Sequence, residues 1–225
     1  MKQVSLTLYT FDELTPEVQN KVIDRERFNI MDRQMEISNS SFRKTLAKFE
    51  QLFSTSVFNW EVDYCGFTYR YKINEIDAYC FDYVRKDGEE VFGEFPLEEL
   101  SGKLLRRYIN NNIVPYLFTR KFYWNGRSKS RHSRIIRNCV CPLTGDVTDT
   151  CILKPFIEFL SSHDFKTTYS QLIDQCIGLM FSAWHEEFQL WADDDNSVRG
   201  VLMDDLDTSY YSDGTVYSGP LELAV

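Results

Sequence analysis

The residues best suited to metal chemistry are aspartates in the C-terminal part of the chain. Asp193, Asp195 and Ser197, with Asp204 at the twelfth position, approach the spacing of an EF-hand calcium loop. Val198 stands where that loop requires glycine, and Asp204 is shorter than the usual bidentate glutamate. The pattern therefore does not favour specific calcium binding.

Two further sets of residues have the chemistry of metal ligands. Asp204, Asp205 and Asp207 carry the charge for a magnesium ion, but carboxylates on one surface helix need partner ligands from elsewhere in the fold. The zinc-type residues in the middle of the chain are Cys139, Cys141, Cys151, His132 and His163. They lack the paired C-x-x-C spacing of zinc ribbons, so reduced, buried thiols are the simpler interpretation. We predict no metal and no cofactor.

Acid–base catalysis would depend on three histidines, His132, His163 and His185. His185 precedes Glu186 and Glu187, but the second histidine of an H-E-x-x-H zinc motif is missing. The sequence also lacks a G-x-S-x-G elbow, a phosphate-binding P-loop and a dinucleotide-binding glycine turn. We therefore expect no catalytic residue, and a protein that acts by binding.

Charge is distributed very unevenly along the chain. Residues 1–100 carry 12 basic and 19 acidic side chains, residues 101–145 carry 10 and none, and residues 146–225 carry 3 and 15. Since local potential governs what a surface attracts, the basic segment 101–145 is a candidate site for nucleic acid or for an acidic protein. The residues proposed for that contact are Arg120, Lys121, Trp124, Arg127, Lys129, Arg131, Arg134 and Arg137. An alternative interpretation is that this segment neutralises the acidic C-terminal third within the fold.

The acidic C-terminal segment 146–225 is the second candidate interface. Its proposed contact residues are Asp193, Asp194, Asp195, Asp204, Asp205, Asp207 and Asp213. Such a surface can imitate DNA phosphates and occupy the cationic groove of a nucleic-acid enzyme, with fast and salt-sensitive association. In the other mode, the basic segment holds RNA or DNA while the acidic part meets a protein.

The periodicity of apolar residues predicts the elements that must position these charges. Alternation favours a strand over Val4–Leu8, a hairpin of strands at 58–64 and 67–73, and a further strand at 78–84 before an Asp87-Gly88 turn. Helices are expected from Thr15 to Met35, from Ser41 to Phe53, and over 97–118 with an interruption near Pro115. Residues 124–133 are too polar to pack and are expected to form a loop or helix end.

The C-terminal half is expected to contain one long amphipathic helix. Apolar residues form a single stripe from about Thr168 to Trp191, after a turn at 141–145 and a short helix at 153–160. A short helix and a hairpin over 210–217, around Asp213-Gly214, should follow. Together these elements predict a single α+β domain over 1–225, with an antiparallel sheet covered by helices. No signal peptide or membrane-spanning run is apparent, which favours the cytoplasm.

Five short stretches, in order along the chain, carry a family resemblance: residues 9–19 (YTFDELTPEVQ), 141–145 (CPLTG) with Asp149, 155–160 (PFIEFL), 167–169 (TTY) and 212–217 (SDGTVY). With these stretches, the chain resembles uncharacterised proteins encoded by phages and prophages of gut and Gram-positive bacteria, some of them labelled antitoxin-like. None of the stretches is a catalytic signature.

The resemblance implies a viral accessory protein in the host cytoplasm. In that setting the leading hypothesis is an anti-CRISPR protein that binds a CRISPR effector nuclease or its ribonucleoprotein, with guide RNA or DNA as a further partner, and without membrane association. The alternatives are a nucleic-acid-binding regulator that uses segment 101–145 and an antitoxin-like partner of one toxin. A metal-dependent nuclease would require Asp204 and Asp205.

Overall fold

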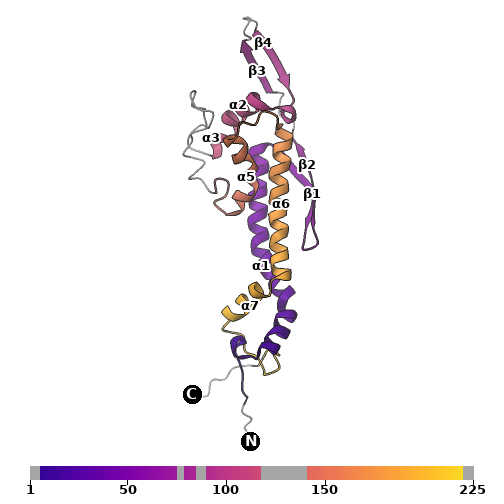
Figure 1. The fold of residues 1–225 in the computed structure, drawn as a ribbon, viewed down its shortest axis with the longest axis vertical. Coiled ribbons are helices and arrows are strands. Elements are labelled where there is room, and N and C mark those ends of the chain that lie inside the picture. The colour runs from indigo at the N-terminus through magenta and orange to yellow at the C-terminus, as the bar shows by residue number, and fades with distance from the viewer. Residues whose placement is uncertain (1–5, 75–78, 85–89, 118–140, 220–225) are drawn as a thin grey trace. The chain divides into compact units, whose positions relative to one another are not determined.

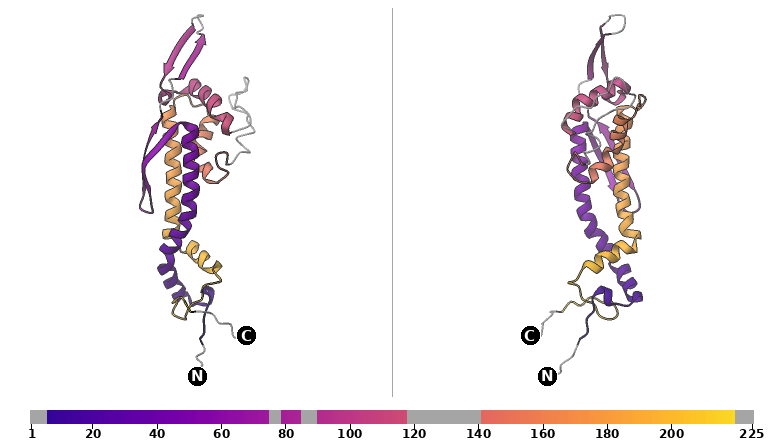
Figure 2. Two further views of the ribbon diagram at one scale, coloured as in Figure 1. Left: turned by 180° about the vertical axis from the view of Figure 1, so that it is seen from behind. Right: turned by 60° about the vertical axis from the view of Figure 1, so that its left-hand side comes forward.

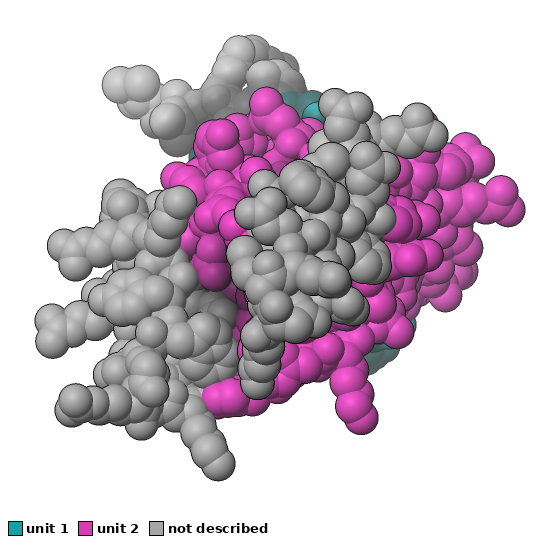
Figure 3. All heavy atoms as spheres, turned by 90° about the horizontal axis from the view of Figure 1, so that it is seen from above, with its two compact units in different colours: residues 1–37, 186–225 teal, residues 38–185 magenta. Residues whose placement is uncertain are grey.

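The computed structural model describes residues 6–74, 79–84, 90–117 and 141–219 (Figure 1). Its backbone contacts group into two compact units, which Figure 3 colours separately. Unit 1 comprises Met1–Ile37 and Glu186–Val225, and unit 2 comprises Ser38–His185. The described residues combine helices with antiparallel strands, which confirms the α+β class. The prediction of a single domain stays a prediction.

Unit 1 joins residues from both parts of the sequence around one small core. It contains the 3-10 helix η1 (Phe11–Glu13), the first part of α1 (Pro16–Phe53), the end of α6 (Tyr169–Asp193) and α7 (Asp195–Asp204). Tyr9 and Tyr210 exchange backbone hydrogen bonds of 2.9 and 2.8 Å. The buried side chains of this core are Phe11, Leu14, Val22, Ile23, Ile30, Val198, Leu202 and Tyr210.

Helix α1 is longer than the sequence pattern suggested. Two helices were expected, with a break between Met35 and Ser41, but one continuous helix of 38 residues runs from Pro16 to Phe53. The intervening residues 36–40 (EISNS) include neither proline nor glycine, so nothing in them forces the helix to end. The polar side chain of Asn39 in this stretch makes a tertiary contact, because its Oδ1 accepts a 2.7 Å hydrogen bond from Trp184 Nε1.

Unit 2 is built on the apolar faces of α1 and α6, which run side by side there (Figure 2). The predicted stripe on α6 is confirmed: its buried side chains are Tyr169, Leu172, Ile173, Cys176, Ile177, Met180, Phe181 and Trp184. On α1, the ring of Phe42 stacks on Trp184 at 5.0 Å, and Phe53 meets Phe156 of α5 (Thr148–Ser161) edge-on at 5.1 Å. Aromatic contacts of this kind bury large areas and hold the helices in register.

The strands of unit 2 form two separate antiparallel pairs within the described residues. The predicted hairpin is confirmed as β1 (Thr55–Val62) with β2 (Phe67–Ile73). Tyr69 of β2 stacks on Phe181 of α6 at 5.0 Å, so one face of this hairpin packs on α6. The other pair is β3 (Tyr79–Val84) with β4 (Glu90–Phe95). The predicted Asp87-Gly88 turn lies outside the described residues.

The segment 97–117 breaks into three short helices, η2 (Leu97–Glu99), α2 (Gly102–Asn112) and α3 (Val114–Leu117). The break before α3 lies at Ile113, close to the interruption expected near Pro115. Near the two ends of the chain, the structure differs from the prediction. Leu6–Leu8 have no regular structure, and residues 210–217 form an isolated bridge between Tyr210 and Val216 around a tight turn. Within the described ranges, none of the helices combines the length and the apolar composition that a membrane span needs.

Candidate charged interface

The negative charge of the protein is concentrated in unit 1. Residues 1–37 and 186–225 carry 17 acidic and 6 basic side chains, a formal charge of −11, whereas residues 38–185 carry 17 and 19, a formal charge of +2. The acidic part is therefore not the C-terminal third alone, because folding adds the N-terminal acids to it. This grouping, which a count along the sequence does not show, creates a strong local field.

Four of the seven predicted contact aspartates have structural roles. Asp194 caps α7, with its carboxylate accepting hydrogen bonds from the backbone of Asn196 and Ser197. Asp195 forms an ion pair with Arg27. The remaining two hold turns: Asp205 accepts from Thr208 Oγ1 at 2.8 Å, and Asp213 accepts from Thr215 N at 2.9 Å. Part of the acidic pattern therefore stabilises the fold of unit 1.

The same hydrogen bonds favour the ionised carboxylates. The hydroxyl of Ser197 and the backbone of Asn196 lower the pKa of Asp194 below its ordinary value, and the backbone N–H of Thr215 lowers the pKa of Asp213. Both groups remain solvent-accessible, so their charge contributes to the external field while their geometry is fixed.

The other three aspartates, Asp193, Asp204 and Asp207, are exposed. Because Asp195–Asp204 form a helix, the EF-hand spacing falls on α7 and not on a calcium loop. Within the described residues, no three His, Cys, Asp or Glu side chains gather as metal ligands. The exposed set is therefore suited to contact with a cationic surface.

The eight predicted contact residues of the basic segment lie outside the described residues: Arg120, Lys121, Trp124, Arg127, Lys129, Arg131, Arg134 and Arg137. Of the basic residues before them, Arg106 is buried at 3 % exposure. Its guanidinium lies over the rings of Phe159 and Phe165 and donates to the backbone oxygens of Ser162 and Asp164, both at 2.8 Å. Arg106 therefore holds α2 to the end of α5 and is not part of a binding surface.

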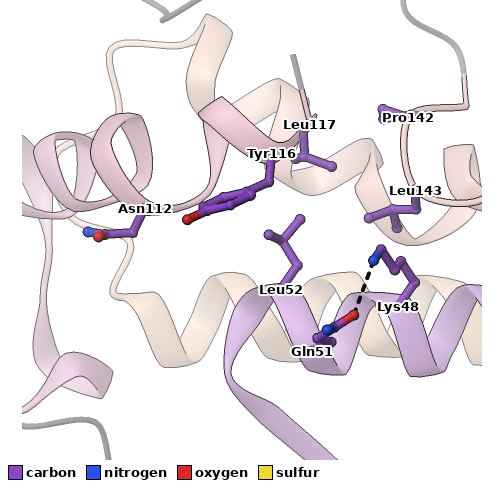
Figure 4. Close-up of a pocket in the computed structure, with 8 residues that line it drawn as sticks. All are labelled: Lys48, Gln51, Leu52, Asn112, Tyr116, Leu117, Pro142 and Leu143. Atoms are coloured by element: carbon purple, nitrogen blue, oxygen red, sulfur yellow. Dashed lines mark hydrogen bonds between the residues drawn. The ribbon is translucent and has the colours of Figure 1, made fainter. Parts of the chain in front are cut away.

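A cavity of about 390 Å³ lies where the described parts of the basic segment end (Figure 4). Lys48 and Leu52 of α1 project toward Leu143 and Tyr116 on the opposite wall. Lys48 Nζ donates to Gln51 Oε1 at 3.1 Å, and the Tyr116 side chain is 75 % exposed. An ammonium group and an accessible aromatic ring can hold a phosphate and a stacked base, respectively.

The wall formed by Pro142 and Leu143 is fixed by the buried carboxylate of Asp149. Its Oδ2 accepts from the backbone N–H groups of Leu143, Thr144 and Gly145, at 2.8, 2.8 and 3.2 Å. Asp149 is completely buried, and these backbone donors satisfy its carboxylate. The turn predicted at 141–145 is therefore closed by the aspartate that follows it, a role of Asp149 that the sequence did not indicate.

The remaining candidate residues are not brought together. His185 Nδ1 lies 2.7 Å from the backbone oxygen of Asp63, on the β1–β2 hairpin. Cys176 is fully buried, and this burial raises the pKa of its thiol far above the ordinary value. Of the zinc-type residues, His132 and Cys139 lie outside the described residues. Nothing in the described parts assembles a nucleophile, base and orienting group.

No protein-family model matches the sequence, and neither curated proteins nor solved structures give a significant match.

Proposed function

We propose that the protein acts without catalysis, by binding the cationic nucleic-acid groove of a protein partner through unit 1. The observation that carries the proposal is the formal charge of −11 on residues 1–37 and 186–225. A groove that binds phosphates is lined by lysine and arginine, and a dense set of fixed carboxylates competes for the same positions. The hydrogen-bonded aspartates around α7 give part of this set a defined geometry.

The partner we propose is a CRISPR effector nuclease, with the protein serving in the cytoplasm of the host bacterium as a phage-encoded inhibitor. Support for this class comes from the resemblance to phage accessory proteins and from the nature of the target. Such effectors hold the guide–target heteroduplex in a positively charged channel, mainly through its backbone. An acidic protein in that channel would exclude the target strand.

The test compares two charge-matched variants. One replaces the exposed aspartates of unit 1 (Asp193→Asn, Asp204→Asn, Asp207→Asn), and the control replaces three exposed glutamates of unit 2 (Glu61→Gln, Glu98→Gln, Glu158→Gln). Affinity for purified CRISPR effectors and inhibition of target-DNA cleavage are measured at low and high salt. The unit 1 variant should bind about tenfold more weakly at low salt, because each lost charge pair contributes about 0.5 kcal/mol.

The control should inhibit as the unaltered protein does, because its three lost charges lie in unit 2 and outside the proposed contact surface. Its net charge changes by the same amount as that of the unit 1 variant. Equal losses in both variants would mean that only overall charge matters. No inhibition of any effector tested would refute the CRISPR assignment.

A second candidate function is nucleic-acid binding at the cavity beside Tyr116. The observation that favours it is the exposed ring of Tyr116, which lines the same cavity as Lys48. The described parts of the basic segment, which end at Leu117 and begin again at Cys141, lie at this cavity. This function predicts that the purified protein shifts single-stranded RNA in a gel, and that Lys48→Gln with Tyr116→Ala weakens the shift. Binding through unit 1 alone predicts no shift, because its acids repel phosphates.

A further inference from the structure

The cavity beside Tyr116 lies within unit 2 and is built from three parts of its fold (Figure 4). The described lining residues come from the end of α1 (Lys48, Gln51, Leu52), from α2 and α3 (Asn112, Tyr116, Leu117), and from the turn at 141–145 (Pro142, Leu143). The volume of about 390 Å³ lies near the lower end of the range of small-ligand cavities. The space therefore suits one compact ligand.

The walls of this cavity are held in place without a ligand. The turn that carries Pro142 and Leu143 is closed by the carboxylate of Asp149, which accepts from Leu143 N at 2.8 Å. Thr45, one turn before Lys48 on α1, donates to the same carboxylate at 3.1 Å, so α1 and the turn are joined. A preformed site of this kind loses little conformational entropy when a ligand binds.

The described lining carries a positive charge. Lys48 is its one charged residue, and neither Asp nor Glu lines the cavity in the described parts of unit 2. Lys48 Nζ donates to the uncharged Gln51 Oε1 at 3.1 Å, and Lys48 forms no ion pair with any described residue. An ammonium group without a counter-charge attracts an anion into the recess.

The opposite wall offers a surface for a flat ring. The side chain of Tyr116 is 75 % exposed, and it shares the cavity with the apolar side chains of Leu52 and Leu143 (Figure 4). An accessible aromatic ring is a stacking surface for a nucleobase. A purely aliphatic ligand would use the apolar walls but not the face of the ring.

Two amide side chains add polar groups to the lining. Gln51 accepts from Lys48 with its Oε1, which leaves its Nε2 hydrogens as donors. Asn112 donates from its Nδ2 to the backbone oxygen of Tyr108 at 3.1 Å, which leaves its Oδ1 as an acceptor. The edges of a nucleobase carry both donors and acceptors, so a lining with groups of both kinds favours a base over a simple aromatic ring.

We propose that this cavity binds one nucleotide, with the base stacked on Tyr116 and the phosphate at Lys48. The proposal deepens the second candidate function, on which it rests, because it limits the contact at this site to one base and one phosphate. The nucleotide can be free or the 5′-phosphorylated end of a strand, since both present the same chemistry. One cation and one exposed ring in the described lining match one such unit.

The experiment is an NMR titration of the whole protein with AMP. The matched control ligands are adenosine, which lacks the phosphate, and phenyl phosphate, which lacks the polar edges of a base. AMP should bind with a Kd on the order of 0.1 mM, and each control ligand should bind about tenfold more weakly.

Two variants separate the phosphate contact from the stacking contact. Lys48→Gln should weaken AMP binding about tenfold and leave adenosine binding unchanged, because only AMP carries the phosphate. Tyr116→Ala should weaken the binding of AMP and adenosine alike, by about tenfold, because stacking involves the base. Both side chains are exposed, so neither substitution removes core packing. Lys72→Gln is the control, because it removes the same charge from β2 outside the cavity lining, and it should leave the AMP affinity unchanged.

Equal affinities for AMP and phenyl phosphate would overturn the proposal, as would an AMP affinity unchanged in both cavity variants. A 5′-phosphorylated tetraadenylate separates the two sources of the nucleotide: tighter binding than AMP assigns the cavity to a strand end, and equal or weaker binding assigns it to a free nucleotide. AMP binding without a gel shift of single-stranded RNA would reject the second candidate function and keep the cavity. A gel shift without AMP binding would reject the cavity alone.

Discussion

Thr45 Oγ1 of α1 donates a 3.1 Å hydrogen bond to Oδ1 of the buried Asp149 on α5. Thr148 Oγ1 lies 2.6 Å from the same threonine oxygen, and Thr144 Oγ1 donates to Asp149 Oδ1 at 2.7 Å. The carboxylate therefore links α1, the turn at 141–145 and the start of α5 through hydroxyl groups and the backbone N–H groups of the turn. One residue with many donors makes this junction sensitive to substitution.

Asp149→Asn should destabilise unit 2 by about 3 kcal/mol or more. The amide nitrogen would face backbone N–H groups or hydroxyls that now donate to an oxygen, and buried donors would lose their acceptor. Urea unfolding measures the change in the free energy of unfolding. Glu158→Gln, an exposed change on the same helix, should stay within about 0.5 kcal/mol of the unaltered protein. Similar midpoints for both variants would contradict the role given to Asp149.

Arg106→Lys should cost about 1–3 kcal/mol of stability, even though charge is conserved. A lysine cannot lie flat over Phe159 and Phe165 while donating to the backbone oxygens of Ser162 and Asp164. Burial lowers the pKa of the Arg106 guanidinium, although its ordinary value is so high that the group stays charged. The neighbouring exposed Arg107→Lys is the control, and thermal melting of both variants separates packing from charge.

Stability should fall as the pH rises from about 10 to about 12. Burial, together with the carboxylate of Asp174, raises the pKa of Tyr69 from 10.0 to about 12. The folded state then holds the phenolic proton more tightly than the unfolded state, so this contribution is complete below pH 10 and is lost as the pH approaches 12. Tyr69→Phe should make the alkaline decline in urea midpoint shallower. An unchanged slope would show that Tyr69 titrates alike in both states.

Gly214→Ala should destabilise unit 1, whereas Gly200→Ala should not. Gly214 has a φ of +85°, and a Cβ there would lie 2.8 Å from methyl groups of both Val18 and Val22. Strain and overpacking together should cost about 2 kcal/mol or more. Gly200 lies in α7 with open space around it, and alanine there should stabilise the helix by about 0.5–1 kcal/mol. Circular dichroism during urea unfolding measures both, and a neutral Gly214→Ala would argue against this packing.

The sequence was sufficient to predict those elements in which buried residues recur with a simple period. The α6 stripe from Tyr169 to Trp184 and the β1–β2 hairpin both have one buried face, so their residue patterns report the structure directly. The continuity of α1 was missed because the two helices were predicted separately, one ending at Met35 and the next beginning at Ser41. Only the tertiary bond between Asn39 and Trp184 shows why a polar residue belongs there.

The candidate site was predicted only in part, because charge along the sequence does not give position in space. The aspartates of α7 were identified by composition, but their division into capping and exposed residues depends on backbone geometry. The acids of α1 that join them, such as Glu26 and Asp32, were not singled out.

Unit 1 also has a consequence for synthesis on the ribosome. Arg25 donates a 2.9 Å hydrogen bond to the backbone oxygen of Gly214, 189 positions later, and the apolar face of the first part of α1 is covered by residues translated equally late. At a synthesis rate of about 5–20 residues per second, roughly ten to forty seconds pass before the residues that cover this helix are made. During translation, the apolar face of residues 16–37 is therefore exposed to chaperones well before the acidic surface exists.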